Sequence, residues 1–304
     1  MEHISYLDDY IKHLEKNKKK PGTIKQYTSD LKQFVGWLES YAKKNLFQLN
    51  DTDLMAYTDH LTKKKFRDTT IKRHMSSINQ FLVFYHINVD LLAENVYRAP
   101  SLELHDFISD KEMNILVQSM QKLIQSVARD ILINRNLAII HLIRYKGLRP
   151  KEASSIDMHM VNLAQSTIKV EVDGQQTIYK LLDKHVQYIR DYLITIDQLK
   201  KPKLKSNDPL FVSFNNRSND YQYDYANEQP KRLSARSIQE MIKDEVRLAG
   251  LRKLSAKHLR NSCILDHILS GQDDKEIQRY FHLTHPFSLY RYKMYQKNLQ
   301  DGNI

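Results

Sequence analysis

The stretch from Lys253 to Tyr295 reads KLSAKHLRNSCILDHILSGQDDKEIQRYFHLTHPFSLYRYKMY. It begins with a basic K-H-L-R turn that opens an apolar pattern of helical period, and it ends in the tyrosine-rich run YRYKMY. A second arginine, Arg149, lies far upstream in the sequence Gly-Leu-Arg. Two separated arginines and a late tyrosine are side chains that can bind one phosphodiester and attack it covalently. The sequence predicts such a site if the fold brings these side chains together.

The composition limits the class of protein. The chain has 304 residues, which suits two domains better than one helical core. No apolar run is long enough to span a membrane, and the N-terminus does not resemble a signal peptide. The single cysteine, Cys263, fits a reducing cytoplasm and excludes a multi-cysteine zinc site. Since no Gly-rich phosphate loop, HExxH motif or Rossmann fingerprint occurs, we expect no metal and no cofactor.

The charge of the chain favours a nucleic acid as partner. The formal net charge is +11, and basic residues cluster at 16–20 and again at 63–73. Clusters of this kind neutralise phosphates when they flank helices. A merely soluble basic protein is the alternative that charge alone leaves open.

The first part of the chain predicts a four-helix domain over residues 1–97. Only 7 glycines and 7 prolines occur in the whole chain, a composition that favours helices. Apolar residues recur at three- and four-residue spacing in four segments, and Asn50-Asp51 can cap the third of them. The first, second and fourth segments are 2–16, 23–42 and 69–87, and the third carries Leu54, Tyr57 and Leu61.

Residues 98–106 are expected to be a linker, and residues 107–304 a second domain that Ser109 and Glu112 open with a capping box. Two alternating runs joined by Asp173-Gly174 predict a β-hairpin. Residues 200–230 are expected to be a disordered polar loop. The remaining segments predict a mainly α-helical domain, with helices at 109–125, 128–146, 184–198, 234–248, 257–270 and 273–282, and a last tyrosine-bearing segment at 286–299.

Three segments, in this order, resemble the signature boxes of the tyrosine recombinases, or phage integrase family. The first is GLRPKEASSI, similar to T-G-L-R-x-x-E-L; the second is KHLRNSCILDHIL, similar to H-x-L-R-H-x-x-A-x-x-L. The third is IQRYFHLTHPFSLYRY, similar to the segment that carries the nucleophile. The N-terminal TIKQY and TTIKRH also resemble this family's SAM-like core-binding domain. The resemblance covers nearly the whole chain and is nearest to the two-domain Xer/Cre-like type.

The resemblance implies a role for each matched residue. Tyr292 falls on the nucleophile, Arg149 and Arg260 on the two phosphate-binding arginines, and Glu152 on a supporting position. The transition state carries extra negative charge, and the planar fork of arginine can hold two phosphate oxygens while staying charged. A 3′-phosphotyrosyl link conserves bond energy, so strands are rejoined without ATP or a metal in this family. Tyr290 and Tyr295 are the rival nucleophiles.

Three positions depart from the family pattern: Lys257, Leu283 and Asn261, which follows Arg260 where the family has a histidine. Lys257 takes the place of the usual histidine in the second box, and a lysine of ordinary pKa is a poor proton acceptor at neutral pH. Leucine stands at Leu283, where a histidine or tryptophan is usual, so we expect His282 to act instead, with His285 as the alternative.

The hairpin should also carry a lysine that protonates the leaving oxygen. Lys169 and Lys180 are both candidates, and Lys169 is nearer to the usual position.

The implied function is site-specific recombination, in which double-stranded DNA with inverted-repeat sites is cleaved and rejoined by a homotetramer in a bacterial cytoplasm. The event would integrate, excise or resolve a mobile element or replicon. We expect DNA contacts from Lys72, Arg73 and Asn79 on the fourth helix and from Lys25, with Gln26, on the second. A catalytically silent DNA-binding regulator and a type IB topoisomerase-like enzyme are the alternatives.

Overall fold

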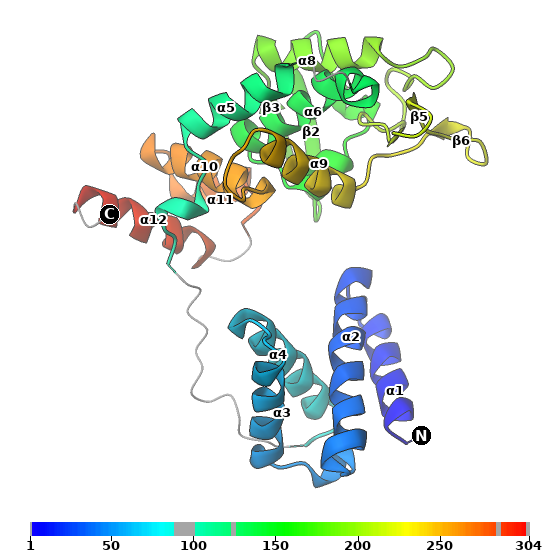
Figure 1. Ribbon diagram of the computed structural model, residues 1–304, viewed down its shortest axis with the longest axis vertical. Helices are drawn as coiled ribbons and strands as arrows, with labels where there is room; N and C mark the ends of the chain where they lie inside the picture. The colour runs from blue at the N-terminus through cyan, green and yellow to red at the C-terminus, as the bar shows by residue number, and fades with distance from the viewer. Residues whose placement is uncertain (1, 88–100, 123–125, 284–286, 302–304) are drawn as a thin grey trace. The chain divides into compact units, whose positions relative to one another are not determined.

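The structure is a computed structural model, and it describes residues 2–87, 101–122, 126–283 and 287–301 (Figure 1). Contacts divide the chain into two units, Met1–Arg98 and Ala99–Ile304, and each is described by itself. Both units are mainly helical, which confirms the predicted fold class. Within the described ranges, no helix is both long and apolar enough to cross a membrane.

Within residues 2–87, the first unit has four α-helices packed around an apolar core, as predicted. They are α1 (Glu2–Lys16), α2 (Pro21–Trp37), α3 (Asp51–Lys63) and α4 (Asp68–Phe84), with a π-helical turn at Leu38–Ala42 after α2. Asn50 accepts a hydrogen bond from the backbone N–H of Asp53, so the predicted cap of α3 is present. Six side chains that the helical period selects are at most 1% exposed: Leu31, Phe34, Leu38, Tyr57, Leu61 and Ile78. Leu46 and Phe81, which it does not select, are equally buried.

A buried carboxylate also joins two helices of this unit. Asp30 on α2 is 2% exposed. Its Oδ1 accepts from Arg73 at 2.6 Å and from Gln26 at 2.9 Å, and its Oδ2 accepts from Ser77 at 3.0 Å. Since an unpaired buried charge is strongly unfavourable, the α4 residues Arg73 and Ser77 fix the packing of α4 on α2.

The second unit is built around α6 (Val127–Lys146), which is buried along most of its length. Helices α8 (Asp183–Ile194) and α10 (Ala256–Leu269) pack against it. The other helices are α5 (Asp110–Gln121), α7 (Pro150–Ser154), α9 (Ala235–Leu248), α11 (Asp274–Tyr280) and α12 (Phe287–Gln300). In Figure 1, α10, α11 and α12 (orange to red) lie together, and contacts join α10 to both of the others.

The predicted hairpin is present as part of a three-stranded antiparallel sheet. Strand β1 (Val161–Asn162) pairs with β2 (Thr167–Val172), and β2 pairs with β3 (Gln175–Lys180). Val172 faces Gln175 across the turn, where Asp173 and Gly174 both have positive φ. This is the two-residue turn that an Asp-Gly pair favours.

The expectation of a disordered loop at 200–230 was wrong. This segment contains two short hairpins, β4 (Phe214–Asn215) with β5 (Asp220–Tyr221), and β6 (Tyr223–Asp224) with β7 (Gln229–Pro230). Leu210, Phe211 and Val212 lie in the core of the unit and are fully buried. Burial of the apolar run Leu-Phe-Val therefore orders this segment, although most of its residues are polar.

Residues 101–106, which the sequence assigned to a linker, lie against the second unit. Leu102 is 2% exposed, and Leu104–Asp106 form a 3-10 turn. The backbone carbonyl of Asp106 accepts from the Asn261 side chain at 3.0 Å.

Two histidines are buried where α6 packs on α8. The centroids of the His141 and His185 rings are 5.4 Å apart. The His141 ring lies against Tyr188, and the His185 ring lies against Tyr145. Among the described residues, neither nitrogen of His141 nor the Nδ1 of His185 has a hydrogen-bond partner. Burial lowers the pKa of His141 to about 3 and that of His185 to about 4, and the nearby charge of Lys184 acts in the same direction on both.

We therefore predict that acid destabilises the second unit through these two residues. In the unfolded chain a histidine takes up a proton below its ordinary pKa of 6.5, whereas the folded unit holds both rings neutral. As the pH falls from 6.5 to about 4, each histidine should therefore lower the free energy of unfolding by about 1.4 kcal/mol for every pH unit. Urea unfolding of His141→Phe and His185→Phe, each against wild type, should show a flatter pH dependence. The exposed His159→Gln is the control, and an equally flat response there would contradict the assignment.

Candidate active site

The candidate site is organised by the carboxylate of Glu152, which is 5% exposed. Arg149 immediately precedes α7 and Glu152 is its third residue, so the side chain folds back on the helix start as in a capping box. Its Oε2 accepts from the backbone N–H of Arg149 at 2.6 Å, and its Oε1 accepts from the Arg149 guanidinium at 2.5 Å. The guanidinium of Arg260, on α10, lies 3.7 Å from Oε2. One carboxylate therefore contacts both of the arginines that the sequence selected.

Arg260 is held by backbone oxygens as well. Its guanidinium donates to the carbonyl of Gly147 and, at 2.6 Å, to the carbonyl of Phe281, and it lies over the Phe281 ring. Burial lowers the pKa of Arg260, and the neighbouring charge of Arg149 acts in the same direction. Glu152 opposes both effects. Because arginine has the highest pKa of the basic side chains, Arg260 remains a cation at neutral pH.

Glycine is required at position 147. Gly147 ends α6 in the left-handed conformation, with φ of 64°. A Cβ built there would lie 2.2 Å from Cε1 of Phe281, whose side chain is fully buried. Only glycine allows both this backbone conformation and the close approach, and together they direct the Gly147 carbonyl to Arg260.

Tyr292 lies beside this cluster, on α12. It is 9% exposed, and its hydroxyl donates to Oδ1 of Asn261 at 2.7 Å. Burial raises the pKa of Tyr292 to about 12, while the charges of Arg260, Arg291 and Arg149 oppose that rise. The tyrosine is therefore protonated at neutral pH in a positive electrostatic field.

The rival tyrosines have different surroundings. Tyr290 is 56% exposed. Tyr295 is 2% exposed, and its ring packs against Phe107 at 4.5 Å between centroids. The arginine charges that act on Tyr292 are not among the causes of the raised pKa of Tyr295, which is burial alone. Of these three tyrosines, Tyr292 has the environment best suited to a nucleophile.

His282 joins the site through its backbone. Its carbonyl accepts from the guanidinium of Arg149 at 3.2 Å. The side chain is 6% exposed, and its two ring nitrogens have no hydrogen-bond partner among the described residues. Burial lowers the pKa of His282, so the ring is neutral at pH 7 and able to accept a proton. Leu283 is partly buried, and the alternative His285 lies outside the described residues.

The predicted lysines are not brought to the arginines. The side chain of Lys257 is 63% exposed, and its Nζ is 3.9 Å from Oδ1 of Asp106. Lys169 and Lys180 are both exposed on the hairpin, and Lys169 alternates with the buried Ile168 and Val170. Within the described part of the chain, neither hairpin lysine forms a hydrogen bond or an ion pair with Glu152, Arg149 or Arg260.

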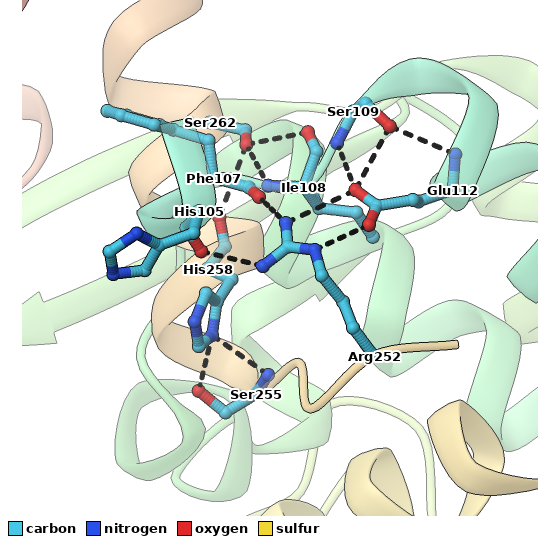
Figure 2. A network of polar contacts seen from close by, with 9 residues as sticks. All are labelled: His105, Phe107, Ile108, Ser109, Glu112, Arg252, Ser255, His258 and Ser262. Carbon is cyan, nitrogen blue, oxygen red and sulfur yellow. Dashed lines mark hydrogen bonds and ion pairs between the residues drawn. The ribbon is translucent and has the colours of Figure 1, made fainter. Parts of the chain in front are cut away.

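His258, one position after Lys257, is engaged at the start of α10. Its Nδ1 lies 3.0 Å from the backbone nitrogen of Ser255 and 2.9 Å from the Ser255 hydroxyl (Figure 2). The ring therefore caps the start of α10.

The nominated DNA contacts of the first unit fall into two groups. Lys25 and Lys72 are exposed, and Asn79 is partly exposed. Arg73 binds the buried Asp30, so it is already engaged inside the unit. If Arg73 also contacts DNA, its guanidinium would have to bind Asp30 and the DNA at the same time.

Asn261 is the site residue that the sequence reasoning did not nominate. Its side chain is 4% exposed and contacts both Tyr292 and the backbone of Asp106. The available signal was its position immediately after Arg260, where the family pattern has a histidine. A polar residue between buried apolar neighbours such as Leu259 and Cys263 also indicates a specific partner.

Sequence comparisons match both units to known domains. Residues 7–86 match the phage integrase N-terminal SAM-like domain, and residues 109–298 match the phage integrase family. A TnP I resolvase of Bacillus thuringiensis is 27% identical over 61% of this chain and 66% of its own length. A tyrosine recombinase XerC of Pseudomonas fluorescens is 24% identical over 90% of this chain and 85% of its own length.

Solved structures share the fold at low identity. The site-specific recombinase XerH, bound to a palindromic difH substrate, has a TM-score of 0.71 at 17% identity and covers 92% of this chain and 79% of its own. A lambda integrase dimer bound to a COC′ core site has a TM-score of 0.64 at 14% identity, with 95% and 94% covered. The family match extends over most of the second unit, which contains Arg149, Glu152, Arg260 and Tyr292. The chain therefore belongs to the phage integrase family, the tyrosine recombinases.

Proposed function

We propose that this protein is a site-specific recombinase that cleaves and rejoins double-stranded DNA through a 3′-phosphotyrosyl intermediate. The observation that carries the proposal is the contact of Glu152 with both Arg149 and Arg260, beside the buried hydroxyl of Tyr292. Two guanidinium groups and one carboxylate leave the cluster with one net positive charge. Such a cluster suits the binding of a phosphate with fixed, preorganised donors.

The proposed reaction is a transesterification at phosphorus. Arg149 and Arg260 hold the non-bridging oxygens, and the Tyr292 oxygen forms a bond to phosphorus as the bond to the 5′ oxygen breaks. The phenol proton passes to a base, for which the neutral ring of His282 is our candidate. The leaving oxygen takes a proton and becomes a 5′-hydroxyl. Lys169 of the hairpin is the proposed donor, and it would have to approach the arginines when DNA binds. The reverse attack rejoins strands, because the tyrosyl ester conserves the bond energy.

We propose that the first unit binds DNA through exposed lysines. Lys25 and Lys72 are exposed on α2 and α4, and they are the phosphate contacts that we propose with most support. Recombinases of the same fold are bound to DNA in their solved structures, which supports DNA as the partner. The palindromic substrate of XerH supports inverted-repeat sites. Assembly of four copies, each supplying one Tyr292, is our proposal for synapsis in a bacterial cytoplasm. The resolvase relative favours resolution of a mobile element as the role.

A catalytically silent DNA-binding protein is the second candidate. Two observations favour it: Lys257 occupies the histidine position of the second box, and the Tyr292 hydroxyl is buried on Asn261. The intact pair of arginines on Glu152 favours the active enzyme, since DNA binding alone does not need that buried arrangement. Relaxation of supercoiled DNA lacking a defined site would instead favour a topoisomerase-like activity.

A nicked duplex that traps covalent intermediates tests the active enzyme. A pool of nicked duplexes of randomised sequence should yield a protein–DNA adduct that survives denaturation. Tyr292→Phe should abolish the adduct, because no other group replaces the phenol oxygen. Tyr290→Phe is the matched control on the same helix and should retain it. An adduct that persists in Tyr292→Phe contradicts the nucleophile, and a wild type without any adduct supports the silent binder.

The salt dependence of DNA binding tests the role of the first unit. If Lys25 and Lys72 each neutralise one phosphate, Lys25→Ala and Lys72→Ala should each reduce the slope of log K against log salt by roughly one. Fluorescence anisotropy with a labelled duplex measures this slope. Lys12→Ala removes an exposed lysine of α1 that pairs with Asp9, and it is the control. Slopes that stay unchanged in both test variants would remove these lysines from the interface.

A further inference from the structure

Both ends of the Asn261 amide are engaged. Its Oδ1 accepts from the Tyr292 hydroxyl at 2.7 Å, and its Nδ2 donates to the carbonyl of Asp106 at 3.0 Å. The amide has one accepting end and one donating end, so the bond to Asp106 determines that the accepting end faces Tyr292. The phenol can then only donate to it.

The residues on either side of Asp106 are held in place by hydrogen bonds, as Figure 2 shows for His105, Phe107 and Ile108. Arg252 donates to the carbonyl of His105 at 2.7 Å and also to that of Phe107. The hydroxyl of Ser262 accepts from the backbone N–H of Ile108 and donates to its carbonyl, both at 2.9 Å. The residues on both sides of Asp106 are therefore fixed to the loop before α10 or to α10 itself.

Apolar packing joins the same segment to the helix of the nucleophile. Leu102 and Phe107 belong to one buried cluster with Leu289, Tyr292 and Tyr295 of α12. The Phe107 ring lies 6.4 Å from the Tyr292 ring, edge to face. Neighbouring residues thus position both parts of the Tyr292 side chain: Phe107 packs against the ring, and Asp106 orients the amide that binds the hydroxyl.

This arrangement favours the neutral phenol. A phenolate at the same place would face the Oδ1 of Asn261, another acceptor, and would lose the hydrogen bond. Turning the amide over would offer the phenolate a donor, but it would leave the carbonyl of Asp106, a partly buried residue, facing an acceptor. Leaving a polar group unpaired where water has little access is unfavourable. The hydrogen bond therefore opposes the loss of the proton that attack on phosphorus requires.

We propose that Asn261 is a positioning residue that holds the Tyr292 hydroxyl in a protonated resting position, with the Asp106 carbonyl setting the orientation of its amide. The bond from Tyr292 to Asn261 must then break before Tyr292 attacks a phosphodiester. This proposal rests on the proposed role of Tyr292 as nucleophile.

The test is the rate of adduct formation under single-turnover conditions, with full-length protein in excess over the nicked duplex recovered from the randomised pool. Asn261→Ala removes the acceptor, and we expect the rate to rise roughly two- to tenfold, the range that one neutral hydrogen bond supplies. The rise of rate with pH should also shift to lower pH, a change that a general structural role of Asn261 does not produce. Asn261→Ser, a milder truncation, should also raise the rate and shift the pH profile to lower pH. It replaces the alanine variant if that variant does not fold.

Ser270→Ala is the control, because the exposed Ser270 lies at the end of the same helix and its hydroxyl donates to the carbonyl of His267 rather than to the segment around Asp106. Its rate and pH profile should equal those of wild type, with thermal unfolding measured for all three variants. An Asn261 variant that is slower than wild type, or unchanged, overturns the proposal. So does an equal acceleration in Ser270→Ala. Absence of any Tyr292-dependent adduct in wild type is a different result, because it refutes the proposed function itself.

Discussion

The carboxylate of Glu152 is the constraint on which the candidate site depends. Two guanidinium groups repel each other, and one of them, Arg260, is largely removed from water. Glu152 contacts both and so makes their proximity favourable, while its own burial is acceptable only because both are there. The cluster keeps one net positive charge for an anion. A phosphate that binds it meets donors already in place, which is the main source of electrostatic catalysis.

The backbone around Glu152 supplies the rest of the geometry. Gly147 ends α6 with a left-handed turn that brings its carbonyl to Arg260 and leaves room for the Phe281 ring. The carbonyls of Phe281 and His282 then bind Arg260 and Arg149, respectively. Segments far apart in sequence thus meet through a few hydrogen bonds to main-chain oxygens, and a change at any one of them should move the arginines.

Much of this arrangement could be predicted from the sequence, because it is encoded locally. The helical period selected many of the buried residues of the first unit, Asp173-Gly174 specified the hairpin, and the family signature boxes singled out Arg149, Glu152 and Arg260. The partners of Asp30 and Asn261 could not be predicted, because they form between residues far apart in the chain. The polar composition of 200–230 was misleading, because three buried residues decided the structure of that segment.

In the proposed reaction, Arg149 and Arg260 act on one phosphate as a single unit. The most direct test is a double-mutant cycle with Arg149→Lys and Arg260→Lys, which keep the charge and remove the planar fork. The rate of adduct formation is measured for wild type, both single variants and the double variant. Each single change should cost roughly a hundredfold or more, and the double variant should lose much less than the product of the two. Losses that simply multiply would show that the two arginines act independently, and would contradict this account.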